Sequence, residues 1–257
     1  MLTVRAAVRP DSEEVSALKV RVKYSKTGPL KFISHLDVMR YFQKSIRRAG
    51  LDIAYSTGLS PHQIISFAAP MPLMLTSVAE YFDAEFLSLP SHDEFIRRLN
   101  EAGTPMMQVW DAAILPEKAL NSMAAVTASS YRVTLTEKGE AELGRVWREQ
   151  IPAEVEQLIQ DEEIVVIKKT KKKEEPTDIR PMIHSCAMDK DAVGMEMLLA
   201  AGSKVNLRPE QILAELSARC GVPYDRFHYD ILRLETYMDD PAGTGLQPLI
   251  KAGNSEF

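Results

Sequence analysis

The chain has 257 residues, 45% of them hydrophobic and 26% charged, and a formal net charge of −5, so it is long enough for one large or two ordinary globular domains. No run approaches the ~20 apolar residues of a membrane-spanning helix, and the first ten residues lack the apolar core of a signal peptide. The two cysteines, Cys186 and Cys220, are too few for a zinc or iron–sulfur cluster and suit a reducing compartment. We therefore expect a cytoplasmic protein without a membrane span, a metal site or a cofactor of its own.

The first half reads as one βαββαβ unit, preceded by a flexible polar tail at residues 1–17. Residues 18–24 alternate between apolar and basic, which predicts a half-buried strand whose outer face carries Lys19, Arg21 and Lys23. After a basic helix, we predict strands at 64–67 and 77–86, a helix from Ser91 to Gly103, and a strand at 109–115. This order is the ferredoxin-like pattern, which we assign to residues 18–118.

The second half repeats this pattern over residues 128–238, with one additional strand. We predict strands at 131–135 and 164–167, separated by a helical stretch from Gly139 to Ile159 that contains Pro152. A hairpin at 179–188 and 193–201, a helix from Pro209 to Cys220 and a strand at 227–237 complete the set. The expected fold is α+β, two tandem ferredoxin-like modules with the helices on one side of each sheet, followed by a flexible tail at 239–257.

The stretch Ser25–Ala69 stands out because two glycine-containing turns, each with a histidine, flank one basic helix. Ser34 and Asp37 predict a capping box at the start of this helix, and Gly50 occupies the position just after its end. Apolar residues recur at helical spacing: Leu36, Met39, Phe42, Ile46 and Ala49. The opposite face carries Arg40, Lys44, Arg47 and Arg48. Such a helix buries its apolar stripe and directs its basic face at solvent or at a polyanion.

Charge is concentrated in the same stretch. Residues 19–68 hold nine Lys or Arg against two acids, a net charge of about +7 in a chain whose total is −5. A basic island in an acidic protein indicates nucleic-acid or phosphate binding, although a solvated helix face can give the same pattern. The RNA-binding candidates in this stretch are Lys23, Lys26, Lys31, His35, Arg40, Lys44, Arg47, Arg48 and His62.

The histidines allow several interpretations. His35 and His62 border the glycine turns, where each could stack on a base, bind phosphate, act in acid–base chemistry or cap a helix. His92 and His228 lie inside predicted elements and are interpreted as structural, and His184 near Cys186 is a weak metal signal. No Ser/His/Asp order, phosphate loop or metal-ligand spacing is present, which argues against a self-sufficient enzyme.

A second basic feature is the tract of residues 168–173, which holds five lysines in six residues. It is typical of a disordered loop tip, but its place between two predicted strands also suits a basic hairpin that reaches a phosphate backbone. We predict that the tract is mobile in the free protein and becomes ordered on RNA. Its RNA-binding candidates are Lys168, Lys169, Lys171, Lys172 and Lys173.

The string Ser-Lys-Thr-Gly-Pro-Leu-Lys-Phe-Ile-Ser-His-Leu-Asp that begins at Ser25, together with Tyr-Ser-Thr-Gly-Leu-Ser-Pro-His at 55–62, resembles the radical-SAM-associated domain family of unknown function. Asn-Leu-Arg-Pro-Glu at 206–210 extends the resemblance to most of residues 18–238. The family usually has a glycine after a Pro-Leu pair in its third segment, whereas here Pro72-Leu73 is followed by no glycine. A weaker likeness, in fold pattern alone, is to the tandem ferredoxin-like RNA processing proteins of CRISPR systems.

The resemblance implies a stand-alone companion of a radical SAM protein, in a genomic setting that implies RNA or ribosome-related work. S-adenosylmethionine and an iron–sulfur cluster are then expected only in the partner. The leading hypothesis is a non-catalytic subunit that binds tRNA or rRNA and acts with the radical SAM enzyme in RNA modification. Two alternatives stay open: a metal-independent endoribonuclease in which His35 assists attack by a 2′-hydroxyl, and an adaptor that binds only protein.

Overall fold

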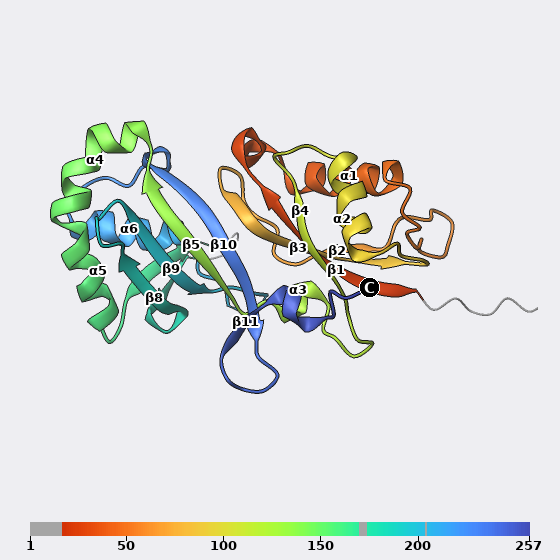
Figure 1. The fold of residues 1–257 in the computed structure, drawn as a ribbon. Coiled ribbons are helices and arrows are strands. Elements are labelled where there is room, and N and C mark those ends of the chain that lie inside the picture. Colours follow the sequence, from red (N-terminus) through yellow and green to blue (C-terminus); the bar gives the residue numbers. More distant parts are fainter. Residues whose placement is uncertain (1–16, 170–173, 204) are drawn as a thin grey trace, which may run out of the picture.

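The computed structural model describes residues 17–169, 174–203 and 205–257 (Figure 1). These residues form an α+β fold of six α-helices, one large mixed sheet and a separate two-stranded hairpin. In these ranges, none of the helices combines the length and apolar character that crossing a membrane requires. The predicted tail at residues 1–17 lies outside the described residues except for its last position.

The elements follow the predicted order with small shifts in their bounds. The first half contains β1 (Leu18–Lys26), α1 (His35–Arg48), β2 (Ile65–Phe67), β3 (Thr76–Phe86), α2 (His92–Glu101) and β4 (Val109–Ile114). The short helix α3 (Ser122–Ala125) leads to the second half. That half contains β5 (Ala128–Leu135), α4 (Glu137–Glu149), α5 (Ile151–Gln160), β6 (Val165–Lys169), β7 (Glu174–Asp178), β8 (Ile183–Met188), β9 (Gly194–Ala200), α6 (Pro209–Arg219), β10 (Tyr229–Asp239) and β11 (Leu246–Pro248).

One sheet runs through both halves of the molecule. Its strand order is β4-β1-β3-β10-β5-β9-β8, with β2 paired to β3 and β11 paired to β10. The halves join where β3 and β10 pair in parallel over Thr76 with Leu232 and Ser77 with Arg233, and the other pairings are antiparallel. The first half therefore has the order β4-β1-β3-β2, and the second half has the order β10-β5-β9-β8.

Each half has its own apolar core between sheet and helices. In Figure 1, α1 and α2 lie on the outer side of the first half, and α4, α5 and α6 lie on the outer side of the second. Phe42 of α1 and Phe95 of α2 are buried in the first core, and Trp147 of α4 and Leu158 of α5 in the second. A third cluster of mostly small side chains, among them Ala79, Ala113 and Ala201, joins the halves.

The structure differs from the prediction in three places. The helical stretch at 139–159 breaks into α4 and α5, because Pro152 lacks the N–H that would continue α4 but is tolerated in the first turn of α5. The strand predicted at 164–167 is β6, which pairs with the unpredicted β7 outside the main sheet. The segment predicted as a flexible tail at 239–257 is folded: β11 pairs with β10, and the 3₁₀ turn η4 (Leu249–Ala252) buries Leu249 and Ile250.

The prediction that Arg21 and Lys23 lie on a solvent face of β1 is wrong. The side chain of Arg21 is fully buried, pairs with Asp83 at 2.8 Å and donates to the carbonyl oxygens of Leu120 and Leu249. Lys23 donates to Glu235 of the second half at 2.5 Å. The second face of the sheet is covered by the C-terminal segment and the other half, so its charged side chains find partners that are remote in sequence.

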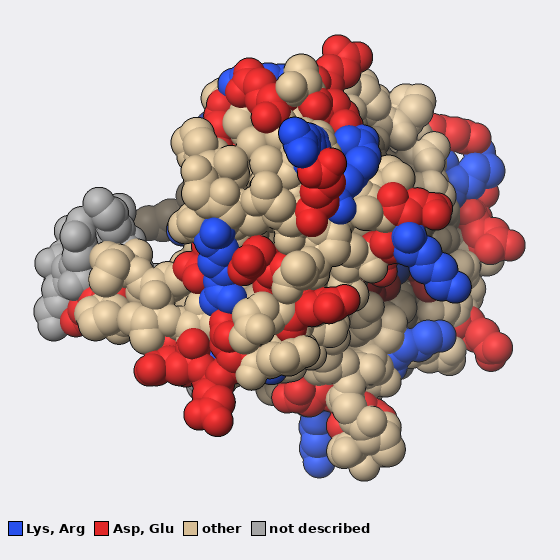
Figure 2. All heavy atoms as spheres, turned by 90° about the vertical axis from the view of Figure 1, so that its left-hand side faces the viewer, with Lys and Arg blue, Asp and Glu red and all other residues tan. Residues whose placement is uncertain are grey.

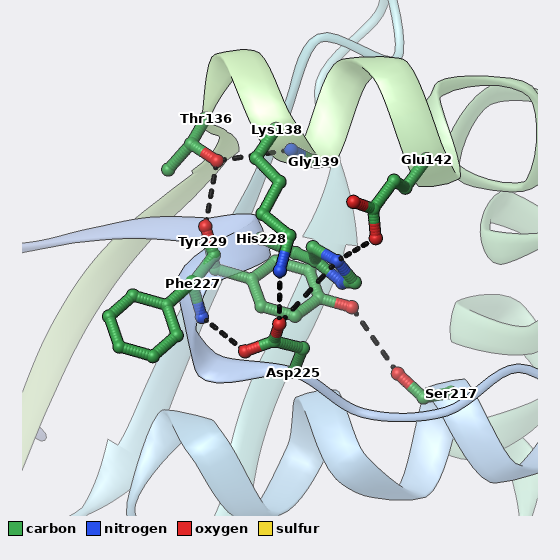
Figure 3. Close-up of polar contacts among 9 residues, drawn as sticks. All are labelled: Thr136, Lys138, Gly139, Glu142, Ser217, Asp225, Phe227, His228 and Tyr229. Atoms are coloured by element: carbon green, nitrogen blue, oxygen red, sulfur yellow. Dashed lines mark hydrogen bonds and ion pairs between the residues drawn. The ribbon is translucent and has the colours of Figure 1, made fainter.

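Polar contacts fix the start of α4 to the 3₁₀ turn η3 (Arg226–His228), as Figure 3 shows. Lys138 pairs with Asp225 at 2.6 Å, and Nε2 of the buried His228 lies 2.8 Å from Oε2 of Glu142. Gly139 packs so closely that an added Cβ would lie 2.1 Å from the carbonyl oxygen of His228. His228 and this glycine therefore serve the fold, in line with the structural interpretation of His228.

The loop between β2 and β3 contains a residue in the left-handed region. Met74, which directly follows Pro72-Leu73, has φ +72°. Its N–H donates to the carbonyl oxygen of Lys31, and its own carbonyl oxygen accepts from Arg226 of the second half at 2.7 Å. Met74 thus has a backbone conformation that favours glycine.

Candidate nucleic-acid interface

Helix α1 forms as its sequence predicts. Ser34 accepts a hydrogen bond from the N–H of Asp37, whose carboxylate accepts from Ser34, so the predicted capping box is present. Gly50 follows the helix with φ +64°. The buried face, however, consists of Val38, Phe42, Ser45 and Ile46, and Leu36 of the predicted stripe is 55% exposed. Phe42 and Ile46 of the predicted stripe are buried, Met39 and Ala49 are partly buried against the core, and only Leu36, at the N-terminal end of the stripe, is exposed.

The basic face of α1 borders a groove. Residues 55–63 fold back on themselves through a bridge between Tyr55 and Gln63 and a hydrogen bond from the N–H of Ser56 to the carbonyl oxygen of His62. This turn and α1 enclose an open hollow of about 280 Å³. We name it the α1 groove; it is lined by Arg40, Gln43, Lys44, Arg47, Tyr55, His62 and Gln63.

The cations of the α1 groove are free to bind an anion. Arg40, Lys44 and Arg47 are all exposed, and they follow one another at four- and three-residue spacing along one helix face. In the part of the chain that the structure describes, neither Lys44 nor Arg47 has a side-chain partner, and Arg40 has only the exposed Asp37 at 3.7 Å. Spacing of this kind suits successive phosphates of a nucleic acid, and the two guanidinium groups can each donate two hydrogen bonds to one phosphate.

The opposite wall of the α1 groove supplies rings and an acceptor. Nδ1 of His62 lies 2.8 Å from Oγ of Ser56, which holds the imidazole in place, and Tyr55 is 51% exposed. Both rings can stack on unpaired bases. Gln63 is buried, its Nε2 donates to the carbonyl oxygen of Gln43, and its Oε1 has no partner among the described residues. That oxygen can accept a hydrogen bond from a hydroxyl or amino group of a ligand.

Several predicted site residues lie elsewhere because they hold the fold together. Lys31 pairs with Asp230 of the second half at 3.1 Å, and Lys23 with Glu235 as described above. Lys26 is buried, donates to the carbonyl oxygen of Ile33, and has a pKa below its ordinary value because burial disfavours its charge. Arg48 is exposed but donates twice to the carbonyl oxygen of Ala102 at the end of α2. The structure therefore separates these four residues from the α1 groove.

His35 lies at the start of α1, apart from the α1 groove. Its ring packs edge-on against Phe67, with 5.1 Å between ring centres. Burial lowers the pKa of the imidazole, Lys26 adds to this effect, and Glu80 opposes it. Among the described residues no hydrogen bond to the His35 ring is found, so no second group is in place to orient it for acid–base chemistry.

The remaining RNA-binding candidates are the lysines of the tract at 168–173, which lies at the edge of the described residues. The backbone of Lys168 and Lys169 ends β6, whereas Lys171, Lys172 and Lys173 lie outside the described residues.

The other two histidines also lie away from the α1 groove. His92 lies 3.0 Å from Asp111 and packs on Phe257. His184 is exposed, and no group of three potential metal ligands is found within the described ranges.

Three residues of the α1 groove were not predicted: Gln43, Tyr55 and Gln63. Tyr55 begins the second motif of the resemblance, so the sequence contained a signal for it. Gln43 lies in α1 and Gln63 in the loop before β2. Their side chains come together at the α1 groove only because residues 55–63 pack on α1.

Comparison with known protein families gives one match. No curated protein matches the chain. A family model described as an uncharacterized protein conserved in bacteria (DUF2344) matches residues 19–209, which include β1, α1, the α1 groove and the loop before α6. The chain therefore belongs to the DUF2344 family.

Proposed function

We propose that this chain is a non-catalytic RNA-binding protein that uses the α1 groove to hold tRNA or rRNA for a radical SAM partner enzyme. The observation that carries the proposal is the joint presence of three exposed cations without strong partners, two aromatic rings and an unpaired buried acceptor in one hollow. Cations that follow the backbone and rings that stack on bases are the two elements of single-stranded nucleic-acid binding.

The distribution of charge over the molecule supports the binding of RNA to the first half. Residues 137–163, which form α4, α5 and the turn after them, hold nine acids against three bases. Asp and Glu side chains are spread over that side of the molecule (Figure 2). An RNA is repelled by this side, and the α1 groove on the first half attracts it, because long-range fields steer a polyanion before contact.

The proposal extends to the architecture. The strand orders β4-β1-β3-β2 and β10-β5-β9-β8 each match a βαββαβ unit, with β6 and β7 as an insertion in the second. We infer that the chain consists of two ferredoxin-like modules, residues 18–118 and 128–238, joined through β3 and β10 into one sheet.

The radical SAM partner is inferred from the motif at residues 25–37 and from the resemblance it carries. In this proposal the partner supplies S-adenosylmethionine and the iron–sulfur cluster, and this chain supplies the RNA. Affinity purification of the chain from its host, followed by identification of the co-purified protein and RNA, tests both parts. A radical SAM protein together with a defined tRNA or rRNA is the expected result.

The RNA-binding part has a direct test with a matched control. Arg40→Ala/Arg47→Ala removes two cations from the α1 groove, and Arg145→Ala/Arg148→Ala removes two from exposed positions on α4. We expect the first variant to bind host RNA at least about tenfold more weakly in a filter-binding assay and the second to bind like the wild type. Equal binding by all three proteins would contradict the proposal and would favour the protein-only adaptor.

Incubating the protein with end-labelled host RNA in the presence of a chelator separates binding from cleavage. We expect intact RNA. Defined cleavage that His35→Ala abolishes would instead support the endoribonuclease.

A further inference from the structure

A cavity of about 270 Å³ lies where the two halves meet, away from the α1 groove. Its walls come from the loop between β2 and β3, from β5 and β10, and from the loop that leads from β9 into α6. That last loop contains the Asn-Leu-Arg-Pro-Glu motif at 206–210, for which the proposed function has no role. We name this space the junction cavity.

The walls of the junction cavity are mostly apolar and stiff. Pro70, Pro72, Leu75, Tyr131 and Ala201 are among the residues that line it. Prolines and alanines lose little conformational entropy when a ligand orders them. A compact group with apolar faces fits such a space, and an extended or strongly hydrated one does not.

One wall residue, Arg233, has a buried hydrogen-bond donor without a partner among the described residues. Arg233 is 5% exposed; its Nη1 donates to Glu80 at 2.9 Å and to the carbonyl oxygen of Ala69 at 3.0 Å, and its Nη2 lies 3.4 Å from the hydroxyl of Tyr131. These contacts fix the guanidinium in place. Its Nε is buried and has no partner among the described residues, and an unpaired buried donor is unfavourable until a ligand supplies an acceptor.

A second wall residue, Glu210, has a buried acceptor without a partner among the described residues. Glu210 stands in the first turn of α6, and its Oε2 is buried without a partner among the described residues. The charge of Arg233 is balanced by Glu80, and Arg208 and Glu210, which also line the cavity, carry opposite charges. The junction cavity is therefore close to neutral, so it does not favour a free phosphate, which needs an excess of cations.

We propose that the junction cavity binds a single nucleobase, turned out of the RNA that the α1 groove holds. This inference rests on the proposed RNA binding. A nucleobase has two flat apolar faces and an edge on which acceptors alternate with amino donors, so it can satisfy Arg233 and Glu210 together. The loop at 68–75 lines the junction cavity, and the N–H of its Met74 donates to the carbonyl oxygen of Lys31 in the turn before α1.

Titration calorimetry with the four nucleosides adenosine, guanosine, cytidine and uridine tests the proposal without RNA. We expect at least one nucleoside to bind the wild-type protein, and inorganic phosphate not to bind at this site. Ala69→Leu fills the junction cavity and should weaken nucleoside binding at least tenfold. Ala242→Leu, the same change at an exposed position in the turn before β11, should leave it unchanged.

A second variant covers the case in which Ala69→Leu does not fold. Ser203→Leu changes an exposed residue at the rim of the same cavity and should weaken nucleoside binding in the same direction. The inference would be overturned if the wild type bound no nucleoside, or if both cavity variants bound nucleosides as tightly as the wild type. Binding of an aromatic peptide in place of nucleosides would do so as well, and would assign the cavity to a protein partner.

Failure of the nucleobase proposal can be told apart from failure of the proposed RNA binding, because different variants affect the two sites. With RNA, Ala69→Leu should lower affinity and leave the salt dependence unchanged, because it removes a base contact and no phosphate contact. Arg40→Ala/Arg47→Ala should leave nucleoside binding unchanged.

Discussion

The ring of His35 packs in the fold, and the burial that comes with this packing sets the charge of the imidazole. It packs against Phe67, and burial keeps the pKa of its imidazole below the ordinary value of 6.5. At neutral pH the ring is therefore uncharged, so it does not contribute a cation to phosphate binding.

This burial has a consequence for stability. Because the pKa of His35 is lower in the folded than in the unfolded chain, the unfolded chain binds more protons below pH 6.5. The free energy of unfolding should therefore fall as the pH falls from 7.5 to 5.5. In urea titrations we expect His35→Gln to lose less stability over this range than the wild type. Parallel curves for the two proteins would show that burial does not shift this histidine.

Met74 is the second residue whose conformation should lower the stability of the fold by a measurable amount. A non-glycine residue in the left-handed region costs about 1 kcal/mol or more, and glycine avoids this cost but loses more entropy on folding. We expect Met74→Gly to raise the free energy of unfolding by about 0.5–1 kcal/mol in urea titrations. Met74→Ala is the matched control, since it removes the same side chain and keeps the strained conformation. A glycine variant no more stable than the alanine variant would refute the assignment of strain.

At the scale of the element, helix α4 offers two glycines with opposite expectations. Alanine is favoured over glycine inside a helix by about 1 kcal/mol. At Gly144 the added Cβ meets only the flexible ends of Glu140 and Arg148, whereas at Gly139 it meets the backbone of His228 at 2.1 Å.

We therefore expect Gly144→Ala to be neutral or to stabilise the protein by up to about 1 kcal/mol. Gly139→Ala should destabilise it by about 1–3 kcal/mol, because α4 must move away from η3. Thermal and urea unfolding of both variants checks the difference. Equal effects at the two positions would mean that α4 does not pack against His228 as described.

Elements with strong local signals could be predicted from the sequence, and those that depend on remote contacts could not. The capping box at Ser34 and the glycine at position 50 fixed both ends of α1, because both signals lie within one turn of the helix. Strand β7 contains Pro176 and pairs only with β6, and β11 is three residues long, so neither shows an alternating pattern. The exposure of Leu36 and the burial of Val38 depend on how α1 packs in the first core, which the pattern of α1 alone does not show.

At the scale of the whole molecule, charge counted along the sequence differs from charge on the surface. Of the nine cations at 19–68, Arg21, Lys23 and Lys31 are paired with acids more than sixty residues away. Lys26 is buried. The basic island that the sequence predicts therefore reduces to Lys19 and the exposed face of α1. The position of the candidate site could be predicted from the helix pattern, whereas its size and the glutamines that line it could not.

The salt dependence of RNA binding tests the α1 groove most directly. Each phosphate that a cation neutralises adds about 0.7 to the steepness of log K against log salt for a single-stranded nucleic acid. Measured from low to high salt on one host RNA, the slope for Arg40→Ala/Arg47→Ala should be shallower than that of the wild type by about 1.4. Arg145→Ala/Arg148→Ala, with the same loss of charge, should keep the wild-type slope. A slope that is unchanged in the α1 variant, or that changes equally in both variants, would contradict the assignment of the α1 groove as the RNA-binding site.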